Sequence, residues 1–348
     1  MRYSSILVAV ICLTISISPI WARKNVKKSA TSSIVTVGNG ASQLAIDLQG
    51  GAIVDFHVTN STVNPFTWKV TNEQMPANNK SGAIFQGHFL CTGRWGAPTE
   101  GEMKAGVPHN GQASRDKWKV LKKTPTSVEM YIKAPLDGIE ITRTVKLNKN
   151  ENALRVTETF YNYTSIGRMF NVVQHATVGA PFLDDSLLVF TNAGKGFMQH
   201  LSYPYPNQYS YNWPMAYNST GADSIDLRLS DTPDSYVSTH IFKDSIGWVV
   251  AVSPTYKLSL VYAWKTSEYP WINIWQERVA GKLWAKGLEF GTAGIGRSYQ
   301  ELFMHNTSFG SQNSFVFLDA KKKLIKSYQC WLVNETDKTE IIKNLTIK

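Results

Sequence analysis

Cysteine is scarce in this sequence, with three residues in a chain of 348. Cys12 lies in the first apolar run, which leaves only Cys91 and Cys330 for the rest of the chain. Two cysteines cannot build a disulfide-held scaffold, so stability must come from a buried apolar core. Their spacing leaves two alternatives open: a disulfide formed in an oxidising compartment, or two buried thiols.

Apolar runs long enough to span a bilayer are also lacking. The N-terminal run from Ile6 to Ile20 is too short and too rich in Ser and Thr for a transmembrane helix, and the small residue Ala22 follows it. This pattern predicts a secretory signal peptide over residues 1–22, with a flexible basic tail over residues 23–32. We therefore expect an exported protein, periplasmic or secreted, with no stable membrane insertion after cleavage. An uncleaved membrane anchor is the alternative.

Clustered charge is missing as well, although the formal net charge is +10. The basic residues are dispersed, apart from Arg23 to Lys28 and Lys321 to Lys323. A nucleic-acid surface needs clustered cations to displace counterions from phosphates, so we expect no nucleic-acid partner. In an exported protein, surface solubility or attraction to anionic glycans is the better interpretation.

Helical periodicity, internal repeats and composition shifts are rare or absent. What is present is a series of short alternating segments broken by Gly, Asn, Asp and Pro, which predicts strands and turns. The clearest of these segments cover residues 127–133, 138–147 and 153–163. Two continuous apolar runs, 247–253 and 258–264, are typical of strands covered on both faces. We expect one all-β domain of stacked antiparallel sheets over residues 33–348.

Two glycine-rich stretches carry polar side chains that are candidates for a site. Glycines flank Arg94 and the pair His109–Asn110, and such turns can aim side chains into a cleft. Arg115 follows in the same stretch. The alternative is an ordinary solvated loop, because His and Arg in loops are mostly surface residues.

Candidate acid and base residues lie near the ends of two other segments. His175 ends an apolar strand, where it can exchange a proton near neutral pH or simply cap the strand. Glu289 lies between apolar neighbours, so burial would raise its pKa toward that of a general base. Glu277 is the more exposed rival.

Aromatic residues are concentrated in the second half of the chain and include Trp271 and Trp275. Aromatic faces pack against the axial C–H groups of sugar rings, while hydroxyls bind polar side chains. The alternative is that these rings fill the core of a large β-sandwich.

The order and spacing of these segments resemble the galactose mutarotase-like superfamily, the aldose 1-epimerases and their relatives. Segments 138–147 and 156–163 are similar to that family's paired central strands, which lead to a strand carrying a catalytic His, here His175. Segment 287–292 resembles the late strand that carries the catalytic Glu, here Glu289. The resemblance implies a large antiparallel super-sandwich.

One loop departs from the family's pattern. Many relatives have His directly before Gly, whereas here Asn110 precedes Gly111 and His109 lies one residue early. Arg115 and Trp118 follow at suitable positions. Asn110 can hold a sugar hydroxyl but cannot share a proton as His does.

The resemblance implies a chemistry in which Glu289 takes the proton of the anomeric hydroxyl and His175 gives one to the ring oxygen, with no metal or redox cofactor. The residues expected to bind and orient the sugar are Arg94, His109, Asn110, Arg115, Trp271, Trp275 and Glu277. The expected partner is a sugar or oligosaccharide, and we expect a monomer.

Two other functions fit the same sequence. The first is a non-catalytic carbohydrate-binding or accessory protein on the same fold, which the shifted His109 and the predicted export favour. The second is a polysaccharide-cleaving enzyme, which ranks last because it usually needs a helical partner domain that this chain lacks.

Overall fold

The structure, a computed structural model, describes residues 33–199, 210–217 and 223–343. The signal peptide and basic tail predicted for residues 1–22 and 23–32, and with them Cys12, lie outside the described residues. The chain from Ser33 onward forms one compact unit.

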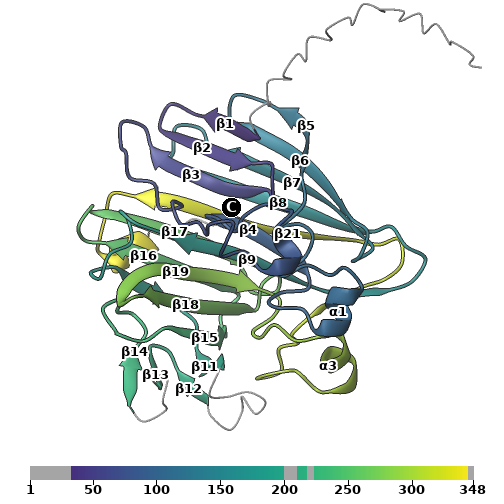
Figure 1. Ribbon diagram of the computed structural model, residues 1–348. Helices are drawn as coiled ribbons and strands as arrows, with labels where there is room; N and C mark the ends of the chain where they lie inside the picture. Colours follow the sequence, from purple (N-terminus) through teal and green to yellow (C-terminus); the bar gives the residue numbers. More distant parts are fainter. Residues whose placement is uncertain (1–32, 200–209, 218–222, 344–348) are drawn as a thin grey trace, which may run out of the picture. The chain divides into compact units, whose positions relative to one another are not determined.

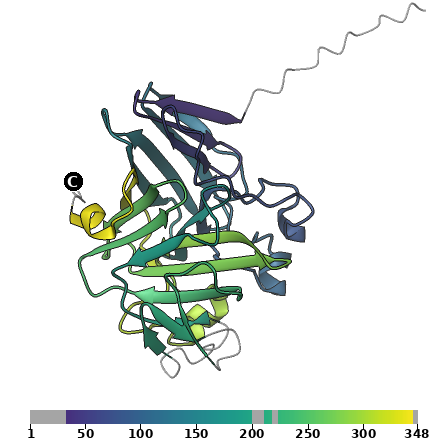
Figure 2. The ribbon, with the colours of Figure 1, turned by 90° about the vertical axis from the view of Figure 1, so that its left-hand side faces the viewer.

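Two large antiparallel sheets make up this unit (Figures 1 and 2). In the 11-stranded sheet the strands follow the order β1 (Ile34–Gly38), β2 (Ser42–Asp47), β3 (Ala52–Val58), β4 (His88–Gly93), β9 (Arg168–Val178), β19 (Lys282–Gly291), β18 (Trp271–Val279), β15 (Tyr236–Ile241), β11 (Lys195–Met198) and β12 (Ser210–Asn212), while β20 (Val316–Leu318) pairs with β9. In the 8-stranded sheet the order is β10 (Leu188–Thr191), β16 (Ile246–Ser253), β17 (Leu258–Lys265), β21 (Lys323–Val333), β8 (Ala153–Asn162), β7 (Ile139–Leu147), β6 (Ser127–Ala134) and β5 (Lys119–Lys123). A two-stranded sheet joins β13 (Met215–Tyr217) and β14 (Ser224–Asp226).

Helices are short in the described part of the chain. They are η1 (Ala77–Asn79), α1 (Glu100–Lys104), α3 (Tyr299–Met304) and α4 (Lys338–Lys343). Both α1 and α3 begin with a capping box, from Thr99 and Ser298 respectively, and lie side by side in Figure 1. Among these helices none is long and apolar enough to cross a membrane.

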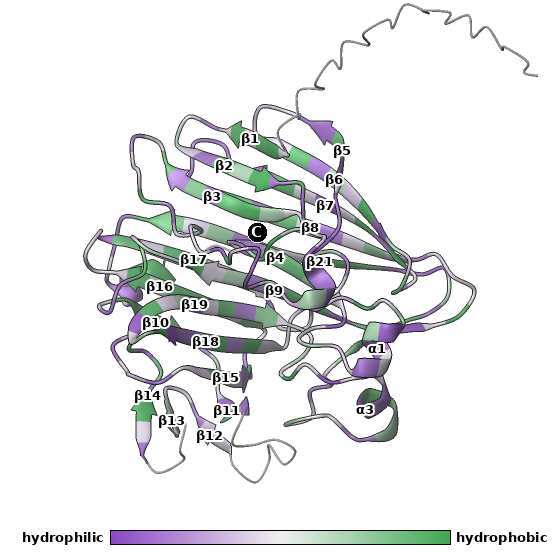
Figure 3. Cartoon of the chain, in the orientation of Figure 1, coloured by the Kyte–Doolittle hydropathy of each residue, from purple (hydrophilic) through white to green (hydrophobic). Residues whose placement is uncertain are grey.

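The predicted meander is confirmed by the strand register. Ser127 pairs with Lys146 and Ala134 with Ile139, so β6 and β7 form the expected hairpin, and β8 pairs with β7 next. The two apolar runs form β16 and β17, and β17 is buried at every residue except its last. Figure 3 shows apolar and polar residues alternating along several strands, as a two-residue period requires.

The main core lies between the two sheets and contains apolar residues from both, such as Leu90 and Val172 from the large sheet and Met130 and Ile141 from the smaller one. The predicted all-β super-sandwich is therefore confirmed. Of the two alternatives for the cysteines, the structure has two buried free thiols: Cys91 is in β4 and Cys330 in β21.

A buried polar network crosses this core. Arg143 of β7 donates to Glu158 of β8 at 2.7 Å and to Gln174 of β9 at 3.0 Å, and Gln174 donates to Glu158 at 2.7 Å. All three side chains are buried, and these hydrogen bonds satisfy their charged and amide groups inside the sandwich. The network ties the middle of β9 to the opposite sheet, one residue before His175.

Candidate functional site

A row of five side chains crosses the face of the large sheet that points away from the main core. Phe89 pairs with His175, His175 with Glu289, Glu289 with Asn273 and Asn273 with Thr239. Residues directly opposite each other in antiparallel strands share a face, so the row brings β4, β9, β19, β18 and β15 into one site. The alternation along β9 explains the direction, because Val172, Gln174 and Ala176 point into the sandwich.

His175 is held on four sides. Its Nε2 lies 3.2 Å from Oε1 of Glu289, and its Nδ1 lies 2.9 Å from the hydroxyl of Thr177. The imidazole stacks on Phe89 with ring centroids 4.3 Å apart, and Trp275 contacts it edge-on at 5.8 Å. These contacts fix which ring nitrogen faces the carboxyl group.

Burial favours the uncharged form of both groups in the pair. It raises the pKa of the Glu289 carboxyl to about 8. Burial, with a smaller repulsion from His109, lowers the pKa of the His175 imidazole to about 3. At neutral pH the pair therefore shares a single proton, which lies on Glu289, so the carboxyl O–H can donate to Nε2 while Nδ1 and the hydroxyl of Thr177 lie within hydrogen-bonding distance.

A pocket of about 360 Å³ opens over this row. Its described walls include Trp95 and Gly96 after β4, and Ile295 and Gly296 after β19. Gly296 is required there, because a Cβ atom at this position would lie 2.4 Å from the backbone oxygen of Trp95. The two loops can approach closely only with glycine at the contact.

Five of the predicted site residues line this pocket: His109, Asn110, His175, Trp275 and Glu289. Burial, with a smaller contribution from Arg94, lowers the pKa of His109 to about 4, so its imidazole is neutral at pH 7. The side chain of Asn110 accepts a hydrogen bond from the backbone N–H of Gly96 at 2.8 Å. Asn110 thus joins two parts of the connection between β4 and β5 at the pocket wall.

Two predicted arginines lie outside the pocket lining. Arg94 is buried and donates to the backbone oxygens of Trp95 and Ala97 and to Glu102, so it shapes the loop that bears Trp95. Arg115 pairs with the neighbouring Asp116 at 2.8 Å. In this structure neither guanidinium is a pocket wall.

Trp271 and Glu277 also lie outside the lining, although they share the strand face of Trp275. The indole of Trp271 is 1% exposed and packs in a small cluster with Phe197 and Phe309. The carboxylate of Glu277 accepts from the indole N–H of Trp275 at 3.4 Å and so orients a residue of the pocket. The more buried Glu289, not Glu277, is the carboxyl that contacts His175.

Several contributors to the site were not among the predicted site residues, and Gln199, Trp68 and Trp95 are three of them. Gln199 lines the pocket, and its amide nitrogen donates to Thr239 at 2.9 Å and to the backbone oxygen of Gly294 at 2.7 Å. Trp68 stacks parallel to His175 with centroids 6.4 Å apart, and Trp95 forms part of the wall. Trp95 was detectable as the aromatic beside Arg94, whereas nothing in the sequence around Gln199 or Trp68 indicates a site.

Groups of three or more His, Cys, Asp or Glu residues that could hold a metal ion do not occur in the described part of the chain. The described lining of the pocket offers acid, base, amide and aromatic groups.

Comparisons by sequence find no matching protein-family model and no matching curated protein. Comparison of structures does find matches. A galactose mutarotase-like protein from Clostridium acetobutylicum is 16% identical, with 86% of this chain and 95% of that chain covered and a TM-score of 0.62. A galactose mutarotase related enzyme from Lactobacillus acidophilus is 12% identical, with 87% and 98% covered and a TM-score of 0.60.

An aldose epimerase homologue from C. elegans is likewise 12% identical, with 88% of this chain and 100% of that chain covered and a TM-score of 0.61. At such identities the likeness concerns the fold and not the activity. The resemblance expected from the sequence is thus confirmed at the level of architecture: this chain has the galactose mutarotase-like β-sandwich fold.

Proposed function

We propose that this protein is an aldose 1-epimerase-like enzyme that interconverts sugar anomers by opening and reclosing the sugar ring. The observation that carries the proposal is the His175–Glu289 pair, 3.2 Å apart and open to a pocket. The anomeric hydroxyl and the ring oxygen are bonded to the same carbon, so the acid and the base that serve them must be neighbours. Structural relatives named as aldose epimerase or galactose mutarotase-related proteins support this reaction class.

The first step uses the single proton that the pair shares. Its transfer from Glu289 to His175 creates a carboxylate and an imidazolium without changing the total charge. The carboxylate then takes the proton of the anomeric hydroxyl while the imidazolium gives its proton to the ring oxygen, and the C1–O5 bond breaks. Rotation about C1–C2 and the reverse proton transfers close the ring as the other anomer.

The remaining walls supply binding groups for a neutral sugar. Trp275 and Trp95 provide aromatic surface for C–H groups, while His109, Asn110 and Gln199 provide polar atoms for hydroxyls. The described lining contains no Lys or Arg. We therefore expect a preference for neutral aldoses over sugar phosphates or uronates.

A non-catalytic carbohydrate-binding function is the second candidate, and one observation favours it. Burial keeps the His175 imidazole neutral, so no proton is held ready for the ring oxygen. Such a protein would bind a sugar in the same pocket without accelerating anomer exchange. Measuring binding and turnover on the same samples separates the two candidates.

The test is the rate of anomer interconversion for freshly dissolved α-aldoses, followed by polarimetry or by NMR exchange, with the spontaneous rate subtracted. We expect the wild-type protein to accelerate the exchange, and the Glu289→Gln and His175→Asn variants to fall to the spontaneous rate. Glu340→Gln is the matched control, because it removes a carboxylate from the exposed face of α4, outside the pocket lining. Wild-type rates in Glu289→Gln would refute the assignment.

We also propose that the protein is exported, on the basis of the apolar run and the Ala22 site in residues 1–22. The compartment would be the periplasm or the outside of the cell, where the partner is a sugar or oligosaccharide. N-terminal sequencing of protein purified from the native compartment should read from Arg23. A sequence that begins at Met1 would contradict the proposal.

A further inference from the structure

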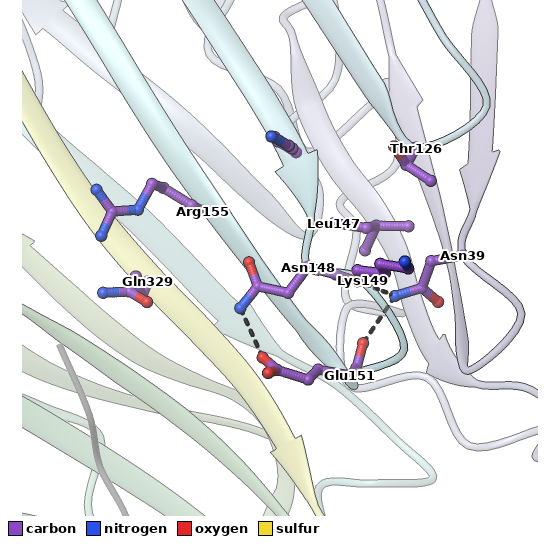
Figure 4. A pocket seen from close by; sticks show the side chains of 9 residues that line it. Asn39, Thr126, Leu147, Asn148, Lys149, Glu151, Arg155 and Gln329 are labelled. Carbon is purple, nitrogen blue, oxygen red and sulfur yellow. Dashed lines mark hydrogen bonds between the residues drawn. The ribbon is translucent and has the colours of Figure 1, made fainter. Parts of the chain in front are cut away.

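A second hollow, of about 730 Å³, lies where turns of the two sheets meet. We call it the basic hollow and define it by its lining residues, which are Asn39, Thr126, Lys146, Leu147, Asn148, Lys149, Glu151, Arg155 and Gln329. Figure 4 shows that Arg155 and Gln329 lie beside each other on adjacent strands, with Asn148 and Asn39 across from them. None of these residues belongs to the His175 pocket.

The charges in the basic hollow come from a row across the smaller sheet. Lys146 of β7 pairs directly with Arg155 of β8, and Arg155 pairs with Gln329 of β21. Like charges directly opposite each other in antiparallel strands repel, so an anion bound over this row would relieve the repulsion. Lys149 adds a third cation to the lining.

Among the described residues of the lining, one is acidic, Glu151. Oε2 of Glu151 accepts a hydrogen bond from the amide of Asn148 at 2.8 Å. The lining therefore holds three cations against one carboxylate that already has an amide partner. This balance favours an anionic ligand.

Hydrogen bonds hold the backbone of the turn that carries Lys149 in place, although the Lys149 side chain is exposed. The amide of Asn39, from the turn between β1 and β2, donates to the backbone oxygens of Asn148 at 2.5 Å and Glu151 at 2.8 Å (Figure 4). The carbonyl oxygen of the Asn39 side chain in turn accepts from the backbone N–H of Ser42 at 2.8 Å. A shape held by bonds between distant parts of the chain is preorganised for a ligand.

The uncharged groups of the hollow indicate the kind of anion. Thr126, Asn148 and Gln329 offer a hydroxyl and two amides, and Gln329 is 5% exposed. Amides and hydroxyls are suitable partners for sugar hydroxyls, whereas the described lining has no aromatic residue to stack on a nucleic-acid base. We propose that the basic hollow binds an acidic polysaccharide through carboxylate or sulfate groups, at a site separate from the His175 pocket.

This inference does not depend on the proposed catalysis, because it uses neither His175 nor Glu289. Its test uses the full protein and four fluorescently labelled probes: an oligogalacturonate, a sulfated galactan oligosaccharide, a neutral galactan oligosaccharide of equal length and single-stranded DNA. We expect one or both acidic saccharides to bind at low salt, and the neutral saccharide and the DNA to bind at least about tenfold more weakly. The two acidic probes identify whether carboxylate or sulfate is the recognised group.

Substitutions then locate the site. We expect the double variant Lys146→Gln/Arg155→Gln to weaken acidic-saccharide binding about tenfold or more, and Lys149→Gln, in an exposed turn, to weaken it about threefold. The matched control Lys265→Gln/Lys323→Gln removes the same charge from exposed ends of β17 and β21 outside the hollow and should change binding less than twofold. Thermal melting of each variant checks the fold, and Lys149→Gln decides the matter if the double variant does not fold.

Three outcomes would overturn the proposal. The first is that neither acidic saccharide binds. The second is an equal loss in the matched control, which would make the attraction a property of net charge. The third is that DNA binds as tightly as the acidic saccharide and that the same variant loses this binding. That result would indicate a general polyanion surface.

Discussion

The His175 pocket and the basic hollow are both built on rows of side chains that face each other across antiparallel strands, yet they differ in burial. His175 and Glu289 are 9% and 4% exposed, whereas Lys146 is exposed and Arg155 is half-buried. Burial suppresses charge in the first row and leaves one mobile proton. Exposure preserves charge in the second row, which leaves an attraction for anions.

The comparison teaches that strand register alone does not determine function. In both proposals the side chains are paired across neighbouring strands. They transfer a proton where loops cover the row, and they bind an anion where water reaches it. The two sites should therefore respond to different perturbations.

The largest expected effect is a separation of turnover from acidic-saccharide binding. Glu289→Gln should lower anomer exchange by about 10²–10⁴-fold, the range for loss of a general acid or base, while acidic-saccharide binding in the hollow stays within twofold of wild type. Lys146→Gln/Arg155→Gln should show the opposite pattern. The measurements are NMR exchange rates and probe anisotropy on the same preparations, and one variant that impairs both would remove the distinction.

A second effect concerns stability. Between pH 6.5 and 8 folded Glu289 keeps a proton that the unfolded chain loses at its ordinary pKa, so the contribution of this carboxyl to the free energy of unfolding falls as pH rises, by about 2 kcal/mol over this window. Below pH 6.5 the lowered pKa of His175 opposes this trend, since the unfolded chain there binds a proton that folded His175 does not. Glu289→Gln should remove this contribution, which is the fall of the wild type relative to the variant.

Urea unfolding at pH 6.5 and pH 8.0 measures this difference. Glu277→Gln and Lys146→Gln/Arg155→Gln serve as controls that keep Glu289 and should retain the wild-type fall. An unchanged pH dependence in Glu289→Gln would show that burial does not raise the pKa of this carboxyl.

The pH dependence of turnover is the third test. The pair holds one proton between about pH 3 and about pH 8, the pKa values of His175 and Glu289. Above pH 8 the pair holds no proton and lacks an acid, so kcat/KM should fall by about tenfold for each further pH unit. Below pH 3 the pair holds two protons and lacks a base. A profile with a midpoint near pH 6.5 instead would indicate that His175 titrates like an exposed imidazole.

Salt should affect binding in the basic hollow and leave turnover in the His175 pocket nearly unchanged. Raising NaCl from about 20 mM to about 200 mM shortens the screening length and should weaken acidic-saccharide binding about tenfold, with little change in the exchange rate of a neutral aldose. Equal salt sensitivity of both readouts would mean that the hollow and the pocket do not act independently.

Much of the fold was predictable from the sequence, because two-residue alternation marks strands such as β6, β7 and β8 directly. The pairing of His175 with Glu289 was not, since residues 114 apart become neighbours only through strand register. That pair was predicted from the family resemblance.

The binding residues show a similar limit. Trp271 and Trp275 share one face of β18, so the two-residue alternation of the sequence cannot distinguish them. In the structure the loop after β19 covers Trp271 and leaves Trp275 open to the pocket. Arg94 was a plausible ligand residue, yet the turn it sits in presents backbone oxygens that bind its guanidinium. Such local partners depend on loop conformation, which composition does not reveal.

The smallest effect tests how His175 is positioned. The hydroxyl of Thr177 lies 2.9 Å from Nδ1, and when it accepts from Nδ1–H it leaves Nε2 to exchange the proton with Glu289. Thr177→Val preserves shape but removes the hydroxyl, and should lower kcat about fivefold with little change in KM, the cost of one neutral hydrogen bond. Thr177→Ser keeps the hydroxyl and should restore the rate, whereas a Thr177→Val variant with wild-type kcat would show that the hydroxyl does not position His175.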